Sequence, residues 1–180
     1  MIYSIPHLVQ FMSTAGKFKV KTLMIYFTED NLWVIAYPHM GARLKNLALY
    51  FGGRQFDWQL VSAAQVFHAL STVFSVVEHL TLKYYRQNSS SEWNNEADRI
   101  HWCKLLGPFV KVKNLSVDGD LIKKISGALQ PVEEESPTEL LPELQNLSHS
   151  ASGDSRNTFA QFVDARQKAG RPVTVTLPRF

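Results

Sequence analysis

Hydrophobic and polar residues follow a six-residue pattern that returns several times along this chain. An aliphatic residue is followed by two mostly polar residues, a leucine, one spacer and a second aliphatic residue. The pattern occurs at residues 20–25 (VKTLMI), 44–49 (LKNLAL), 77–82 (VEHLTL) and 112–117 (VKNLSV). A fifth copy at 144–149 (LQNLSH) ends in His149, and a weaker sixth copy covers 173–175. Such self-similarity is typical of stacked repeat units, which usually bind other macromolecules.

Each copy alternates as a strand should, so its central leucine and last aliphatic residue share one face. Most copies follow a segment with helical periodicity. Helices are expected at residues 5–15, 62–74, 97–109, 121–129 and 158–169. Gly170 stands where a left-handed helix C-cap belongs, and Pro172 prevents the last helix from continuing.

The segment between the first two copies is too short for a full crossover helix. Residues 32–37 are better interpreted as an extra strand, which makes a small meander with residues 20–27 and 44–51. The other helix–strand units predict a mostly parallel sheet with helices on one face. The fold expected for residues 1–180 is therefore a single α/β domain, an irregular leucine-rich-repeat-like array with a β-meander near its N-terminus. Its aliphatic positions should face the helices and form one core.

Composition narrows the class of protein. A hydrophobic content of 45% with 12% aromatic residues excludes a largely disordered chain. The formal charge is +3, and the basic residues form no stripe, so nucleic acid is not the expected partner. The single cysteine, Cys103, cannot form an internal disulfide, and residues 1–16 lack the features of a signal peptide. We therefore expect an intracellular protein of the cytoplasm or nucleus.

Residues 58–77 contain no Asp, Glu, Lys or Arg, and this segment is long enough to span a bilayer. Polar residues interrupt it, however, and its apolar residues recur at helical spacing. The apolar positions are Leu60, Ala64, Phe67, Leu70, Phe74 and Val77. The pattern predicts an amphipathic helix with one buried stripe, and no membrane partner is expected.

Several segments resemble the leucine-rich part of fungal F-box proteins, in particular the expanded families of mushroom-forming fungi. They are residues 56–59 (FDWQ), 64–67 (AQVF), 74–82 (FSVVEHLTL), 102–109 (WCKLLGPF), 112–115 (VKNL), 140–144 (LLPEL) and 162–174 (FVDARQKAGRPVT). The likeness covers nearly the whole chain, more loosely before residue 40. It implies the target-recognition half of a cullin–RING ubiquitin-ligase receptor, in which the repeats hold a target protein.

In that family an N-terminal F-box of helices docks the ligase adaptor. Here the repeats begin at once, and no Leu-Pro-rich helix trio precedes them. The sequence therefore does not predict adaptor binding, and we expect a fragment or truncated form of such a receptor.

Motifs for catalysis or cofactor binding are not found in the sequence. There is no Gly-x-Gly-x-x-Gly, no Walker loop and no Gly-x-Ser-x-Gly elbow. Gly52 and Gly53, followed by Arg54, are better interpreted as a turn than as a phosphate cradle. His101 and Cys103 lack the second ligand pair that a tetrahedral metal site needs, and Cys103 fits the core side of its helix. No enzyme activity, cofactor or metal is therefore expected.

The outward face of the strands is the candidate protein-binding site, because small hydrogen-bonding side chains and tyrosines line it. Its residues are Thr22, Met24, Tyr26, Asn46, Tyr50, His79, Thr81, Lys83, Asn114, Ser116, Asp118, Asn146 and Ser148. Tyrosine is a favoured interface anchor. The simpler alternative is a solvated sheet face without a partner, because exposed polar positions are the rule.

The leading hypothesis is a non-enzymatic protein-interaction module with an unknown target protein. A nucleic-acid-binding repeat array is an alternative, suggested by the basic isoelectric point, near 9.0, and the strand face. A small α/β hydrolase or transferase is a weaker alternative, suggested only by the alternation of helices and strands.

Overall fold

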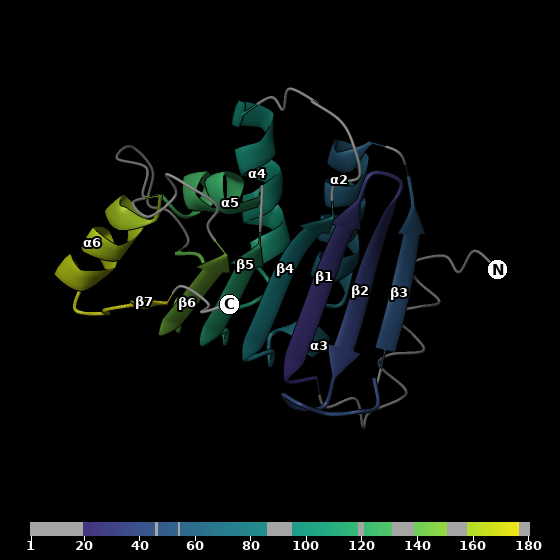
Figure 1. Ribbon diagram of the computed structural model, residues 1–180, viewed down its shortest axis with the longest axis horizontal. Helices are drawn as coiled ribbons and strands as arrows, with labels where there is room; N and C mark the ends of the chain where they lie inside the picture. The colour runs from purple at the N-terminus through teal and green to yellow at the C-terminus, as the bar shows by residue number, and fades with distance from the viewer. Residues whose placement is uncertain are drawn as a thin grey trace.

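The computed structural model describes residues 20–45, 47–53, 55–85, 95–118, 121–130, 139–150 and 158–176. These residues form a mixed α/β structure with a seven-stranded, mostly parallel sheet and five helices. The strands are β1 (Thr22–Thr28), β2 (Asn31–Tyr37), β3 (Leu47–Gly52), β4 (His79–Tyr85), β5 (Asn114–Asp118), β6 (Asn146–Ser150) and β7 (Thr174–Thr176). The helices are α2 (Phe56–Ala69), α3 (Ser71–Phe74), α4 (Asn95–Leu106), α5 (Leu121–Leu129) and α6 (Ala160–Lys168). In Figure 1, α2, α4 and α5 lie behind the sheet.

Two kinds of connection set the strand directions. The strand order is β3-β2-β1-β4-β5-β6-β7. A short turn joins β1 to β2, a longer one joins β2 to β3, and both of these pairs are antiparallel. The pairs β1–β4, β4–β5, β5–β6 and β6–β7 are parallel. Parallel neighbours need crossover connections, and helices are part of every crossover here. The predicted meander and the mostly parallel sheet are confirmed.

The same backbone turn introduces three of the parallel strands. The N–H groups of Val77, Val112 and Leu144 donate to the carbonyl oxygens of Phe74, Phe109 and Leu141, at 3.1, 3.4 and 3.0 Å. All six side chains are buried. We call this arrangement the repeat turn: a buried residue, two spacers and a buried aliphatic residue. The repeated unit therefore begins three residues earlier than the six-residue pattern indicates.

Carbonyl groups just before the strands link one repeat to the next. Each of these carbonyl oxygens accepts two N–H groups from the start of the neighbouring parallel strand, at 2.9 to 3.0 Å. The sets are Lys21 with Glu78 and His79, Glu78 with Lys113 and Asn114, and Lys113 with Gln145 and Asn146. Successive units therefore stack on one another in the same way, as expected of a repeat array.

The inward strand face and the helices form one hydrophobic core. Its strand residues are at most 1% exposed: Leu23, Ile25, Leu80, Leu82, Leu115, Val117 and Leu147. Burial of each such side chain contributes about 1.5–3 kcal/mol. Phe67 of α2 joins Phe74 and Phe109 of the repeat turns, with ring centroids 4.9 and 5.4 Å apart. His149 takes the last aliphatic position of its strand and is also buried, against Phe159.

Most predicted helices are present, with different ends. Helix α5 matches its prediction, whereas α2 begins at Phe56 rather than at residue 62, and a break at Leu70 separates it from α3. The apolar stripe expected over residues 58–77 is buried along its whole length. Gly170 adopts a φ of 71°, which confirms the left-handed end of α6. The helix predicted at 5–15 lies outside the described residues.

One aliphatic position of the pattern was wrongly placed in the core. Leu44 is 81% exposed, and Leu47 and Leu49 are only partly buried. Strand β3 is antiparallel to its neighbour and is entered from the residues that follow β2, not from a helix and a repeat turn. Among the described residues, the second copy of the pattern therefore has less helical cover than the other copies.

Candidate protein-binding face

The strand face opposite the helices carries rows of side chains that run across the sheet, and we call it the open face. Strand register places Tyr37, Thr22, His79, Asn114, Asn146 and Thr174 in a first row. A second row contains Ile35, Met24, Thr81, Ser116, Ser148 and Thr176. A third contains Tyr50, Trp33, Tyr26 and Lys83, with Asp118 next to Ser150 further along. The predicted binding residues all lie in these rows, except Asn46, which is outside the described residues.

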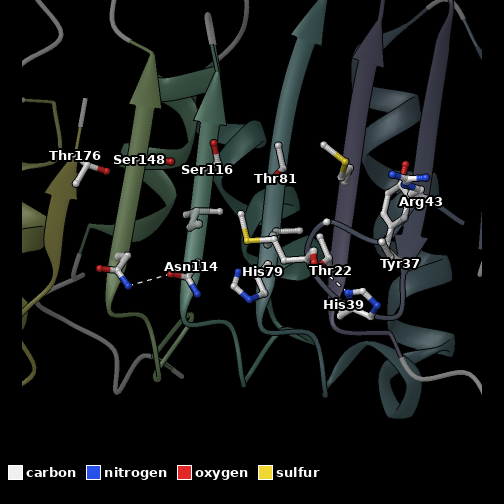
Figure 2. Close-up of a pocket in the computed structure, with 17 residues that line it drawn as sticks. Thr22, Tyr37, His39, Arg43, His79, Thr81, Asn114, Ser116, Ser148 and Thr176 are labelled. Atoms are coloured by element: carbon white, nitrogen blue, oxygen red, sulfur yellow. Dashed lines mark hydrogen bonds between the residues drawn. The ribbon is translucent and has the colours of Figure 1, made fainter. Parts of the chain in front are cut away.

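A groove of about 630 Å³ lies on the open face, between the first two rows and residues 38–43. Figure 2 shows His39 and Arg43 near Tyr37 and Thr22 at one end, and Thr176 of β7 at the other. The groove therefore crosses the strands instead of following one of them. With about 4.8 Å between neighbouring strands, the path from β1 to β7 is about 19 Å long.

Sequence reasoning missed the wall of this groove. Residues 38–43 connect β2 to β3, and His39, Met40 and Arg43 from this connection line the groove. The glycine in the connection, Gly41, has a φ of 77°, a left-handed conformation that side chains rarely adopt. Pro38 and Gly41 signal a turn in the sequence. These two residues do not indicate that the turn folds toward the sheet.

Side chains on the groove floor hold one another in place. The Asn146 side chain donates from Nδ2 to Oδ1 of Asn114, at 2.9 Å. This contact uses the carbonyl oxygen of Asn114, so the N–H groups of the Asn114 amide are left to donate elsewhere. Beyond the groove, the Ser150 hydroxyl donates to the Asp118 carboxylate. The floor thus presents an amide pair held by its own hydrogen bond, beside the hydroxyls of Thr81, Ser116 and Ser148.

Aromatic rings gather on the other part of the open face, over β1 to β4. We call Tyr50, Trp33, Tyr26 and Tyr85 the aromatic stripe. The rings of Trp33 and Tyr50 meet edge to face at 4.7 Å, and those of Tyr26 and Tyr85 stack at 5.9 Å. Trp33, Tyr50 and Tyr85 are 44, 56 and 52% exposed. Of the four, sequence analysis singled out only Tyr26 and Tyr50.

Tyr26 sits deepest in the stripe. Burial raises the pKa of its phenol, and the neighbouring phenols of Tyr85 and Tyr37 raise it further. The hydroxyl therefore stays protonated at neutral pH, and it donates to the Met24 sulfur at 3.3 Å. Tyr26 links the aromatic stripe to the groove, because Met24 lines the groove.

A permanent charge lies along the groove, on Arg43. His39 and His79 line the groove too, and none of the described lining residues is Asp or Glu. Glu78, beside His79 in the sequence, forms an ion pair with Lys21, and this hydrogen bond is the main reason that the pKa of the carboxyl is lowered. Arg43 is exposed and makes no hydrogen bond or ion pair with any other described residue.

Candidate chemistry elsewhere has structural explanations. Burial raises the pKa of the Cys103 thiol, and its sulfur lies 3.9 Å from the Ala128 carbonyl oxygen, between α4 and α5. The described residues contain no group of three His, Cys, Asp or Glu side chains placed to hold a metal ion. A Cβ atom at Gly53 would clash with the Trp58 ring at 2.3 Å, so a tight contact requires this glycine. Arg54 lies outside the described residues.

Comparison with known proteins identified no relative. No family model, no curated protein and no solved structure matches this chain. Among the helices that the structure describes, none has the length and apolar character to cross a membrane.

Proposed function

We propose that this protein is a non-enzymatic protein-interaction module that acts inside the cell, in the cytoplasm or nucleus. It is similar in organisation to the target-recognition part of F-box ubiquitin-ligase receptors, and its open face holds a target protein. The observation that carries the proposal is the groove on the open face, where strand register brings the predicted polar residues of four strands together.

The repeated backbone contacts support a repeat array of the leucine-rich type. The repeat turns and the paired N–H contacts to Lys21, Glu78 and Lys113 recur from unit to unit. In such arrays each unit contacts its neighbours, and the sheet side provides an extended binding surface.

The size and composition of the open face also suit a protein partner. Seven strands at about 4.8 Å spacing give a width of about 29 Å, and a strand of about six residues is about 20 Å long. The resulting area of roughly 600 Å² approaches the roughly 800 Å² that one partner buries in a standard interface. The aromatic stripe adds exposed tyrosine and tryptophan, the residue types that most often anchor interfaces.

The test is to recover binding proteins from cells that produce this chain, with the groove floor either open or blocked. Ser116→Tyr with Ser148→Tyr places two bulky neutral side chains in the groove, at partly exposed positions where the fold should tolerate them. A matched control, Gln65→Tyr with Gln161→Tyr, adds the same bulk on exposed positions of α2 and α6.

We expect the wild-type chain and the control to retain the same proteins, identified by mass spectrometry, and the blocked variant to lose them. Circular dichroism should show that all three are folded. Proteins that bind the blocked variant as well as the wild type would contradict the proposal.

A further inference from the structure

We infer that the target presents an extended acidic segment to the groove, with its carboxylates against Arg43 and His79. This inference rests on the proposed function of the open face and adds the chemistry of the partner. The permanent positive charge on the groove wall is that of Arg43, and the imidazoles of His39 and His79 lie along the same groove. No lining residue in the described part of the chain supplies a carboxylate that would compensate Arg43, so a partner that brings carboxylates balances its charge.

Arg43 is free to make this contact. Its side chain is exposed and has no hydrogen bond or ion pair with another described residue. A guanidinium group can donate two parallel hydrogen bonds to one carboxylate, which makes the pairing directional as well as attractive. The gain is larger in a groove than on a flat surface, because the walls of the groove displace water from the pair.

Uncharged hydrogen-bond donors lie along the floor of the groove, beyond Arg43. The amide of Asn114 retains its N–H groups after its carbonyl oxygen accepts from Asn146. The hydroxyls of Thr81, Ser116 and Ser148 follow in the second row. These groups suit the carbonyl oxygens and polar side chains of a segment that begins at Arg43 and crosses toward β7.

The length of the groove sets the length of the extended segment that we propose. An extended chain advances about 3.3 Å per residue, so the path of about 19 Å from β1 to β7 holds about six residues. The acidic residues of this segment lie near the end that meets Arg43.

The same residues favour carboxylate over phosphate and over nucleic acid. Phosphorylated segments are typically held by clusters of arginines, and the lining residues that the structure describes include one arginine. Nucleic acid binding needs several Lys or Arg contacts along a backbone. On the open face only Arg43 and Lys83 carry permanent positive charge among the described groove and third-row residues.

The experiment is a selection of random twelve-residue peptides, displayed on phage, against the purified full chain. We expect Asp and Glu to be enriched at least twofold over the starting library in the bound peptides. The best peptide is then synthesised and its affinity is measured by fluorescence anisotropy. Arg43→Gln should weaken binding about tenfold, since a charge-assisted hydrogen bond is lost. Lys123→Gln, on the exposed side of α5, is the matched control and should leave the affinity unchanged.

Charge reversal makes the test sharper. A chain with Arg43→Glu should select peptides enriched in Lys and Arg instead of Asp and Glu. Three results would overturn the inference: no bound peptides, bound peptides without acidic enrichment, or an affinity unchanged by Arg43→Gln. If replacing an acidic residue of the best peptide by phosphoserine tightens binding over tenfold, the groove is assigned to phosphorylated segments. If a dT20 oligonucleotide binds more tightly than the peptide and in a salt-sensitive way, the groove is assigned to nucleic acid.

Failure of this inference and failure of the proposed function can be told apart. Ser116→Tyr with Ser148→Tyr should abolish binding of any peptide held on the groove floor. If non-acidic peptides bind the wild type and are lost on this variant, the open face still binds protein and only the acidic chemistry is wrong. If the cellular partners of the chain bind this variant as well as they bind the wild type, the proposed function itself is wrong.

Discussion

The two halves of the open face share one sheet but differ in side chains. Over the antiparallel strands β1 to β3 the face carries large rings, such as Trp33 and Tyr50. Over the parallel strands β5 to β7 it carries small groups, such as Ser116 and Ser148, and β4 between the two regions carries Tyr85. The inner face differs too, because helices bury Leu115 completely whereas Leu47 of β3 is only partly buried.

This difference shows how each half obtains its stability. The parallel half is held by its helical layer, so its outer face is free to carry polar groups. The meander has less helical cover at β3, and its outer rings pack against each other across the strands, a contact that stabilises sheets by roughly 0.2–1 kcal/mol per pair. The rings are thus both part of the fold and available to a partner.

The largest expected effect is on the inner face. Leu115→Ala should lower the free energy of unfolding by about 2–5 kcal/mol, as for other core leucines. Leu47→Ala should cost clearly less, under about 2 kcal/mol, because its side chain is only partly buried. Urea denaturation of both variants measures the difference. Equal costs would show that the meander is covered as well as the parallel half, and the comparison would fail.

The next largest loss of stability is expected near the C-terminal end of the parallel half, at Arg166. The buried guanidinium of Arg166 binds Glu139 and donates to the carbonyl oxygens of Pro142 and Leu144, both at 3.0 Å. Arg166→Ala should cost about 3 kcal/mol, because the two buried carbonyl oxygens lose their donor and the carboxylate keeps only the exposed Arg171 as a partner. Arg171 binds the same carboxylate but is half exposed, so Arg171→Ala should cost less than about 1 kcal/mol. Thermal unfolding of both variants tests this contrast.

A smaller effect is expected at His149, where a substitution should raise the free energy of unfolding instead of lowering it. Burial lowers the pKa of its imidazole, and Nδ1 has no hydrogen-bond partner among the described residues. The unfolded chain therefore takes up a proton more readily, so stability should fall as the pH drops below about 6.5 and stay constant above it. His149→Leu should raise stability by about 1 kcal/mol and flatten this dependence.

Unfolding of both proteins between pH 5 and pH 8 measures the effect of His149. The control is His68→Gln on the exposed side of α2, which should leave the pH dependence as it is. A wild-type stability that does not change with pH below 6.5 would contradict the role given to His149.

The smallest effect on stability is expected in the aromatic stripe. Trp33→Ala should cost less than about 1 kcal/mol of unfolding free energy, because the ring is 44% exposed. Its effect on target binding should exceed its effect on stability, as for other interface anchors, which contribute about 2 kcal/mol or more. Calorimetry with an isolated target compares the two quantities. A loss of stability larger than the loss of binding would make the stripe a packing feature alone.

Alternation along the chain was sufficient to predict the repeated strands and the faces of their side chains, and the helical segments between them predicted the parallel directions. Alternation works because side chains of a strand lie on opposite faces in turn, as Leu80 and His79 show. The end of α6 was predictable from local chemistry, because Gly170 readily adopts the left-handed conformation.

The repeat turn and the groove were not predictable in this way. Phe74, Phe109 and Leu141 occupy the same place in the turn but are not the same residue, so the six-residue pattern did not include them. The groove depends on how residues 38–43 fold over the sheet, a tertiary arrangement that periodicity does not record. Trp33 and Tyr85 were missed because the pattern does not cover β2 or the last residues of β4.

The repeat turn makes this chain open to growth by whole units. Strands β4, β5 and β6 begin with the same turn and the same pair of N–H contacts to the unit before them, so a duplicated segment of residues 109–140 is one whole period and carries both ends of its own junction. Insertion of one copy should lengthen the sheet by about 4.8 Å and add a new position to the first two rows. A lineage, or an engineer, could thus change the length of the recognised segment without rebuilding the fold.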